Sequence, residues 1–135
     1  MKKPIILISF LILGFAQNVN AQETDTSTVY KLFQVQQKAE FPGGDTALDK
    51  FIINNMVIPD SAYELAGSGT ILVSFVIEKD GSLSGINISS IRKIGFGVEE
   101  AAIDVIKKMP KWKPAIYGDK PCRMAFMKPI RLKFN

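Results

Sequence analysis

Histidine is absent from the 135 residues, and cysteine occurs once, as Cys122. A zinc site built from His and Cys is therefore excluded, and so is an intramolecular disulfide. Acid–base and nucleophilic catalysis lose their usual base, and no glycine-rich phosphate loop follows a predicted strand. Adjacent Glu99 and Glu100 diverge by about 100° on a helix, so they do not form a catalytic pair. We expect no enzyme activity and no metal or cofactor, and Cys122 is best explained as a buried thiol.

Long apolar segments are scarce, and the longest lies at the N-terminus. Lys2 and Lys3 precede an uncharged run of 13 residues, 4–16, and residues 19–21 follow with short side chains. A membrane-spanning helix needs about 18 or more apolar residues. The pattern predicts a cleavable signal peptide at residues 1–21 and export to the periplasm. If the segment is not cleaved, it would instead anchor the chain at the inner membrane.

Acidic residues are few in the C-terminal part of the chain. From Lys107 onward nine Lys and Arg face one acid, Asp119, whereas residues 22–106 carry six basic and twelve acidic side chains. An exported protein rarely meets nucleic acid, and no nucleic-acid-binding motif is present, so we expect no nucleic-acid partner. The basic part indicates either a solvated face balanced by the acidic part or a surface for an anionic partner.

Proline is missing between residues 22 and 40, which excludes a stiff polyproline spacer there. Residues 22–28 are polar, as is typical of disordered chain. Residues 29–36 are rich in β-branched and aromatic side chains and predict a short leading strand. We interpret residues 22–39 as a linker that contains this strand.

Two short helices are predicted before the first long strand. The turn-forming residues 41–44 precede Asp45, which is placed to cap a helix over residues 46–54. The apolar stripe of this helix consists of Leu48, Phe51 and Ile52. Pro59 can open a second short helix over residues 59–65, which Gly67 ends.

The middle of the chain predicts a hairpin followed by a helix. Apolar and mixed side chains alternate over residues 70–78, and the Asp80-Gly81 pair separates this strand from a return strand over residues 83–91. After a loop, residues 98–109 carry an apolar stripe of helical period with acids at the start and lysines at the end.

A corner at residues 109–114 joins this helix to the last predicted strand. Pro110 and Pro114 bracket the only tryptophan, Trp112. Proline fixes φ and disfavours helix in the residue before it, so the chain should leave the helix here and continue extended. Trp112 either caps the core or helps to present the last strand to a partner.

The last strand alternates from Cys122 to Phe134. Pro129 cannot donate to a strand ladder, which predicts a sheet edge or a bulge. The helical crossover predicts that this strand pairs antiparallel with the first, in the order second, first, third. The fold class is therefore α+β: a three-stranded antiparallel sheet with two or three helices packed on one face, and a more open opposite face that carries basic side chains.

Five pieces of the sequence together resemble the C-terminal domain of the TonB energy-transducer family. They are Phe41-Pro42-Gly43-Gly44, the Asp80-Gly81 hairpin, Gly95-Phe96-Gly97, the Glu99-Glu100-Ala101 helix and Met109-Pro110-Lys111-Trp112-Lys113-Pro114. The resemblance covers residues 40–134, and we place the domain at residues 40–135. It implies the α+β fold given above.

The resemblance also implies a partner. TonB proteins couple the inner-membrane proton-motive force to outer-membrane transporters, and their C-terminal domain pairs its sheet edge with the TonB box, a short extended transporter segment. Carried across by position, the contacting strand would be residues 123–133. The implied partner-binding residues are Trp112, Lys113, Arg123, Ala125, Met127, Pro129, Arg131 and Lys133.

Two departures from the family pattern leave alternatives open. A complete transducer has a membrane anchor and a long proline-rich spacer, whereas here the N-terminal segment is predicted to be cleaved; in addition, Ile58-Pro59 stands where the family has Tyr-Pro. The leading hypothesis is a periplasmic binding module for transporters or other transport components. The alternative is an accessory envelope protein that binds peptidoglycan or anionic surfaces without energy coupling. Either could be a monomer or a strand-exchanged dimer.

Overall fold

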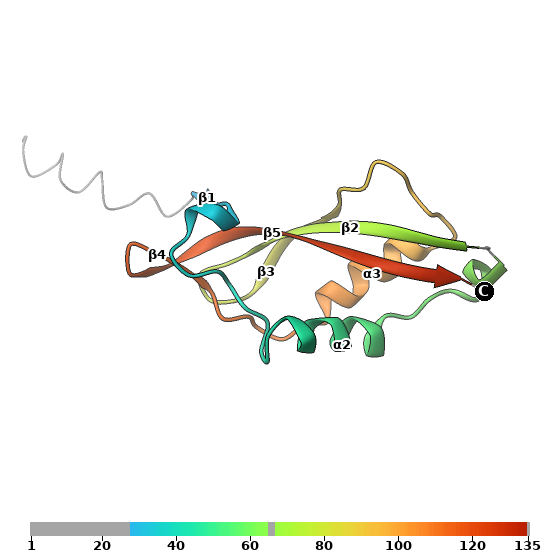
Figure 1. Cartoon of the computed structure of the whole chain (residues 1–135), viewed down its shortest axis with the longest axis horizontal. Helices are drawn as coiled ribbons and strands as arrows, with labels where there is room; N and C mark the ends of the chain where they lie inside the picture. Colours follow the sequence, from blue (N-terminus) through green and yellow to red (C-terminus); the bar gives the residue numbers. More distant parts are fainter. Residues whose placement is uncertain (1–27, 65–66, 135) are drawn as a thin grey trace, which may run out of the picture.

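A long antiparallel pair of strands forms the spine of the molecule (Figure 1). The computed structural model describes residues 28–64 and 67–134, so the predicted signal peptide and nearly all of the polar stretch 22–28 lie outside the described residues. Strand β2 (Gly67–Ile77) pairs with β5 (Lys120–Phe134) in one continuous register from Gly67 opposite Phe134 to Ile77 opposite Met124.

The remaining elements are arranged around this pair. They are β1 (Val29–Tyr30), the 3-10 helix η1 (Leu32–Gln34), α2 (Asp45–Asn55), the 3-10 helix η2 (Asp60–Glu64), β3 (Leu83–Ile88), α3 (Val98–Lys107) and β4 (Ala115–Tyr117). The sheet order is β1-β5-β2-β3, and β4 pairs with β5. The predicted fold class and the order of the three long strands are confirmed, and two short strands extend the sheet beyond the predicted three.

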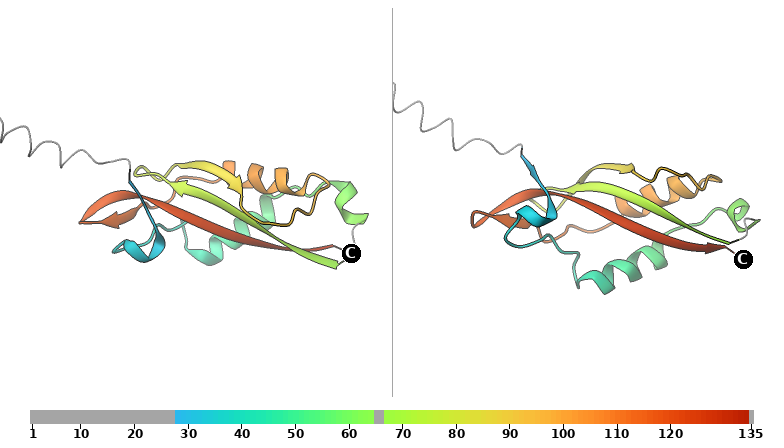
Figure 2. Two further views of the ribbon diagram at one scale, coloured as in Figure 1. Left: turned by 90° about the horizontal axis from the view of Figure 1, so that it is seen from above. Right: turned by 45° about the horizontal axis from the view of Figure 1, so that its top comes forward.

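The alternation of side chains along β2 separates the two faces of the sheet. Ile71, Val73, Phe75 and Ile77 are buried, whereas the residues between them are half-buried. The buried face packs against the helices: α3 lies against β2 and β3, and α2 lies alongside β5 (Figure 2). The opposite face of the sheet is the more open one, as predicted.

The predicted hairpin forms with a three-residue loop. Glu78 N–H donates to the carbonyl of Ser82 at 2.8 Å, and Gly81 N–H donates to the carbonyl of Glu78 at 2.9 Å. Gly81 has a φ of +87°. This is the geometry of a turn followed by a left-handed glycine. The register of β3 with β2 shifts by one residue near Gly85 and resumes at Asn87 and Ile88. The strand ends at Ile88 rather than at residue 91, because the next N–H of β2, that of Leu72, bonds to the side-chain hydroxyl of Ser90 instead of a backbone carbonyl.

Two local expectations before β2 are corrected. Asp45 is the first residue of α2 and not its cap; Gly44 occupies the cap position with a φ of +89°, which favours glycine over any other residue. The carboxylate of Asp45 lies 3.6 Å from the Lys38 ammonium instead. The second short helix is present as η2, a 3-10 helix whose Ala62 is buried.

The leading segment is less extended than predicted, because only Val29 and Tyr30 form a strand and η1 follows at once. Strand β1 is parallel to β5, with Val29 opposite Arg123 and Tyr30 opposite Met124. The chain then runs antiparallel to residues 113–116, where Glu40 and Lys113 exchange two backbone hydrogen bonds of 3.0 and 2.8 Å. Ala39, which the sequence assigns to the linker, is only 2% exposed.

The corner after α3 is held by aromatic packing. Trp112 is 4% exposed and lies edge-on to the rings of Phe41, Phe75 and Phe126, with centroid distances of 5.3 to 5.7 Å. Its indole N–H has no acceptor among the described residues, so ring contacts rather than hydrogen bonds of the side chain hold it. The interpretation of Trp112 as a core residue therefore fits its position, and Cys122 is buried as expected.

Sequence reasoning missed a second hairpin. Strands β4 and β5 are joined by Gly118 and Asp119, both with positive φ. Two left-handed residues are the requirement of a two-residue type I′ turn. The Gly-Asp pair between two short extended runs was the available signal.

Gly81 provides a test of how the hairpin contacts the corner. A Cβ atom at Gly81 would lie 2.0 Å from the carbonyl oxygen of Trp112, whereas one at Gly118 would meet nothing within 4 Å. Both glycines have positive φ. We expect Gly118→Ala to lower the free energy of unfolding by about 1–2 kcal/mol through backbone strain alone. Gly81→Ala should cost about 3 kcal/mol or more, because the clash adds to the strain. Urea denaturation of both variants measures this, and equal losses would contradict it.

Candidate partner-binding edge

The outer edge of β5 is divided into a covered and an open part. Strand β4 pairs with residues 120–122, and β1 pairs with Arg123 and Met124. From Ala125 to Phe134, no strand of the described residues pairs with the side of β5 that faces away from β2. The open part of the edge is therefore residues 125–134.

The backbone of Leu72 shows which groups of β5 point outward. Leu72 N–H donates to Ser90 Oγ at 2.9 Å, and its carbonyl accepts from Ser89 N–H at 2.8 Å, so both groups of Leu72 face the β3 side. Its register partner on β5 is Pro129. This pair is consequently a non-hydrogen-bonded one, and the nitrogen of Pro129 faces the open edge. The missing N–H costs the β2–β5 ladder nothing, which is the edge role predicted for this proline.

The same alternation gives the rest of the edge its hydrogen-bonding groups. Successive residues of a strand turn their backbone groups to opposite sides. The N–H and carbonyl groups that point outward with the Pro129 carbonyl are those of Ala125, Met127, Arg131 and Lys133. The side chains of these residues and of Pro129 are exposed on the open face of the sheet. Five predicted site residues thus form one continuous exposed row.

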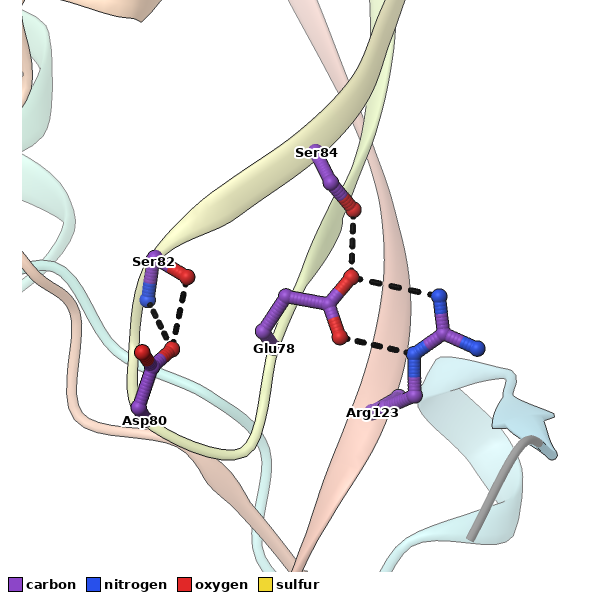
Figure 3. A network of polar contacts seen from close by, with 5 residues as sticks. All are labelled: Glu78, Asp80, Ser82, Ser84 and Arg123. Carbon is purple, nitrogen blue, oxygen red and sulfur yellow. Dashed lines mark hydrogen bonds and ion pairs between the residues drawn. The ribbon is translucent and has the colours of Figure 1, made fainter.

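Arg123 lies on the same face but has a different role. Its guanidinium donates through Nε to Glu78 Oε1 at 2.7 Å and through Nη2 to Glu78 Oε2 at 3.2 Å, and the hydroxyl of Ser84 donates to the same carboxylate (Figure 3). These hydrogen bonds hold the pKa of Glu78 below its ordinary value and raise the pKa of Arg123. The side chain of Arg123 therefore links β5 to β2 and is already engaged in the free protein.

The other two predicted site residues lie at the corner. Lys113 is exposed, and its backbone pairs with Glu40. Trp112 is buried beneath the sheet. A contact of either residue with a partner stays a prediction. Because Trp112 is buried, it could influence a partner only indirectly, by holding its neighbour Lys113 in place.

Residues of α2 beside the edge were not among the predicted site residues. Lys128 points to the helix side of β5, and its ammonium lies 2.6 Å from Asp49 Oδ1. A groove of about 320 Å³ lies between helix and strand, lined by Asp49, Ile52 and Ile53 of α2 and by residues 128–131 of β5. Sequence periodicity identified Ile52 as a core residue, but no sequence signal places α2 next to β5.

Within residues 28–64 and 67–134, no three acidic or cysteine side chains come together as metal ligands would. In the same part of the chain, no helix is long and apolar enough to cross a membrane. The groups that the open edge exposes are the outward N–H and carbonyl groups of the backbone and the row of side chains beside them. Such an arrangement can bind an extended peptide.

Comparison with protein-family models matches residues 54–134 to the family described as Gram-negative bacterial TonB protein C-terminal. The match spans more than half of the chain and contains β2, β3, α3, β4 and β5. It confirms the resemblance inferred from the five sequence motifs; the boundary at residue 40 stays a prediction. No curated protein matches the chain.

The Glu78–Arg123 pair predicts a dependence of stability on pH. Because the pKa of Glu78 in the folded protein lies below its ordinary value of 4.5, the pair stabilises the fold above that pH. The stabilisation is lost as the pH falls through the lowered pKa. We expect the unfolding midpoint in urea to fall less steeply below pH 4.5 in Glu78→Gln than in the unmodified protein. Exposed Glu64→Gln serves as the control, and identical pH profiles for all three proteins would contradict the expectation.

Proposed function

Because the chain belongs to the Gram-negative bacterial TonB protein C-terminal family, we propose that it is a periplasmic interaction module that binds outer-membrane transporters by β-strand addition. The proposed partner is a TonB-box-like extended segment of the transporter, which pairs with β5. Domains of this family are protein-interaction domains that act in envelope transport. The family gives the general role, and the residues of β5 support the specific mode of binding.

The observation that carries the proposal is the open edge at residues 125–134. Its outward N–H and carbonyl groups belong to Ala125, Met127, Arg131 and Lys133, and no described strand pairs with them. In strand addition, such main-chain groups supply much of the affinity of an extended peptide. At about 3.4 Å per residue, residues 125–133 offer about 30 Å of edge. Strand β1 limits this length at one end, because it already pairs with Arg123 and Met124.

The charges beside the edge favour an acidic residue in the partner. Arg131 and Lys133 are exposed, and neither forms an ion pair with another of the described residues. A carboxylate on a partner strand directly opposite Arg131 would lie on the same face of the sheet as the guanidinium. Cross-strand pairs of opposite charge contribute roughly 0.2–1 kcal/mol. The charge thus adds selectivity, whereas the backbone hydrogen bonds supply most of the binding affinity.

A proline substitution separates the backbone contribution from that of the side chain. Arg131→Ala removes the charge and keeps the outward N–H, whereas Arg131→Pro removes both and leaves the β2–β5 ladder intact, as Pro129 already does. We expect Arg131→Pro to bind a TonB-box-like peptide about five- to tenfold more weakly than Arg131→Ala, because it lacks one edge hydrogen bond. Titration followed by amide NMR signals along residues 123–133 measures both affinities, and melting temperatures verify the fold of each variant.

The outcomes distinguish the candidate functions. Peptide affinities that are equal for the proline and alanine variants would contradict strand addition, and no amide shifts at saturating peptide would contradict binding at this edge. Retention on purified peptidoglycan that weakens steeply with salt, without peptide binding, would instead favour the accessory envelope protein, because exposed charges are screened within about 8 Å at physiological ionic strength.

A further inference from the structure

The groove between α2 and β5 borders the open edge at residues 128–131. Residues 128–131 form one wall of the groove, and the same segment contains the outward backbone groups at Pro129 and Arg131. The other wall is the face of α2 that carries Asp49, Ile52 and Ile53. Any strand that pairs with this part of β5 therefore also lies over the mouth of the groove.

The alternation of side chains determines which partner residue meets the groove. Cross-strand neighbours point to the same face of a sheet. A partner residue opposite Arg131 points to the open face, and its neighbour opposite Ile130 points to the helix side. The buried side chain of Ile130 and the half-buried side chain of Lys128 show that this is the side on which α2 lies. One partner side chain in two consequently points to the helix side of the sheet, and the one opposite Ile130 is directed at the groove beside α2.

The surface of the groove is mainly aliphatic. Ile53 is 76% exposed and Ile52 is 5% exposed, so one isoleucine stands at the rim and the other forms the floor. Three charged residues contribute to the lining of the groove. The ammonium of Lys128 lies 2.6 Å from Asp49, so these two charges neutralise each other, and the third, Arg131, belongs to the exposed row on the open face of the sheet. The stem of Lys128 adds further apolar surface. A branched aliphatic or aromatic side chain is therefore the ligand that suits this site, because it would cover Ile53 without burying an unpaired charge.

We propose that this groove receives one apolar side chain from a helix-facing position of the added strand, and that Ile53 determines this specificity. The inference rests on the proposed strand addition and adds the chemistry of the segment that is recognised. The partner segment carries an apolar residue next to the residue that lies opposite Arg131. Main-chain pairing then provides general affinity, and the groove distinguishes among extended segments.

A double-mutant cycle tests this assignment. The probes are two nine-residue threonine-rich peptides, one with a central Glu-Leu pair and one with Glu-Ser in its place. The proteins are the unmodified chain, Ile53→Ser and the matched control Ile91→Ser. Ile91 is also exposed but lies in the loop between β3 and α3, and β3 is the strand at the opposite edge of the sheet. Because both substitutions are on the surface, we expect little change in melting temperature.

The unmodified protein should bind the leucine peptide about tenfold more tightly than the serine peptide, as partial burial of a leucine side chain predicts. Ile53→Ser should reduce this ratio to about threefold or less, whereas Ile91→Ser should retain it. A ratio unchanged by Ile53→Ser would overturn the groove assignment while leaving strand addition intact. If neither peptide binds any of the three proteins, the proposed function itself fails. A second copy as the occupant would show as a concentration-dependent dimer that Ile53→Ser disrupts without changing the peptide ratio, and this result would also overturn the assignment.

Discussion

The antiparallel ladder between β2 and β5 is the constraint on which the rest of the structure depends. Its register is uninterrupted from the Gly67/Phe134 pair to the Ile77/Met124 pair. Because side chains and backbone groups both alternate along a strand, this single register decides two things at once. It directs Met124, Ile130 and Phe134 into the core, and it turns the backbone groups of alternate residues, Ala125, Met127, Pro129, Arg131 and Lys133, toward the open edge. A shift by one residue would bury Arg131 and hide those outward groups against β2.

The aromatic cluster around Trp112 connects this ladder to the segments that flank it. Phe75 comes from β2, Phe126 from β5 and Phe41 from the turn before α2, and all three rings contact the indole. The backbone N–H of Trp112 also donates to the carbonyl of Gly81 at 2.8 Å. The corner therefore fixes the hairpin, the sheet and the start of α2 relative to one another. The corner leads into β4, which turns back into β5, so the packing of Trp112 helps to position the open edge although its own side chain is buried.

Sequence patterns predicted the elements that are determined locally. The strong alternation of β2, the helical stripe of α3 and the turn at Asp80-Gly81 each need only neighbouring residues to be read, and all three are present. The edge position of Pro129 also follows from a local property, the missing N–H. The parallel pairing of Val29 with Arg123 and the ion pair between Asp49 and Lys128 join residues 94 and 79 positions apart. No local signal encodes such contacts. The groove, and the end of the open edge where β1 pairs with β5, could therefore be found only from the fold.

An open sheet edge invites pairing with another copy of the same chain, and Pro129 opposes this more strongly than it opposes a foreign strand. Its nitrogen faces outward, so one carbonyl of any partner strand that lies opposite it is left without a donor. In a dimer of two identical edges each copy contributes its own proline, and two hydrogen bonds are lost. A foreign strand without proline loses one, a difference of about 0.5–1.5 kcal/mol. The repulsion between the Arg131 and Lys133 side chains of two copies acts in the same direction, whereas an acidic segment would be attracted. Under the proposed strand addition, the edge therefore suits an acidic foreign segment without proline better than it suits a second copy of the chain.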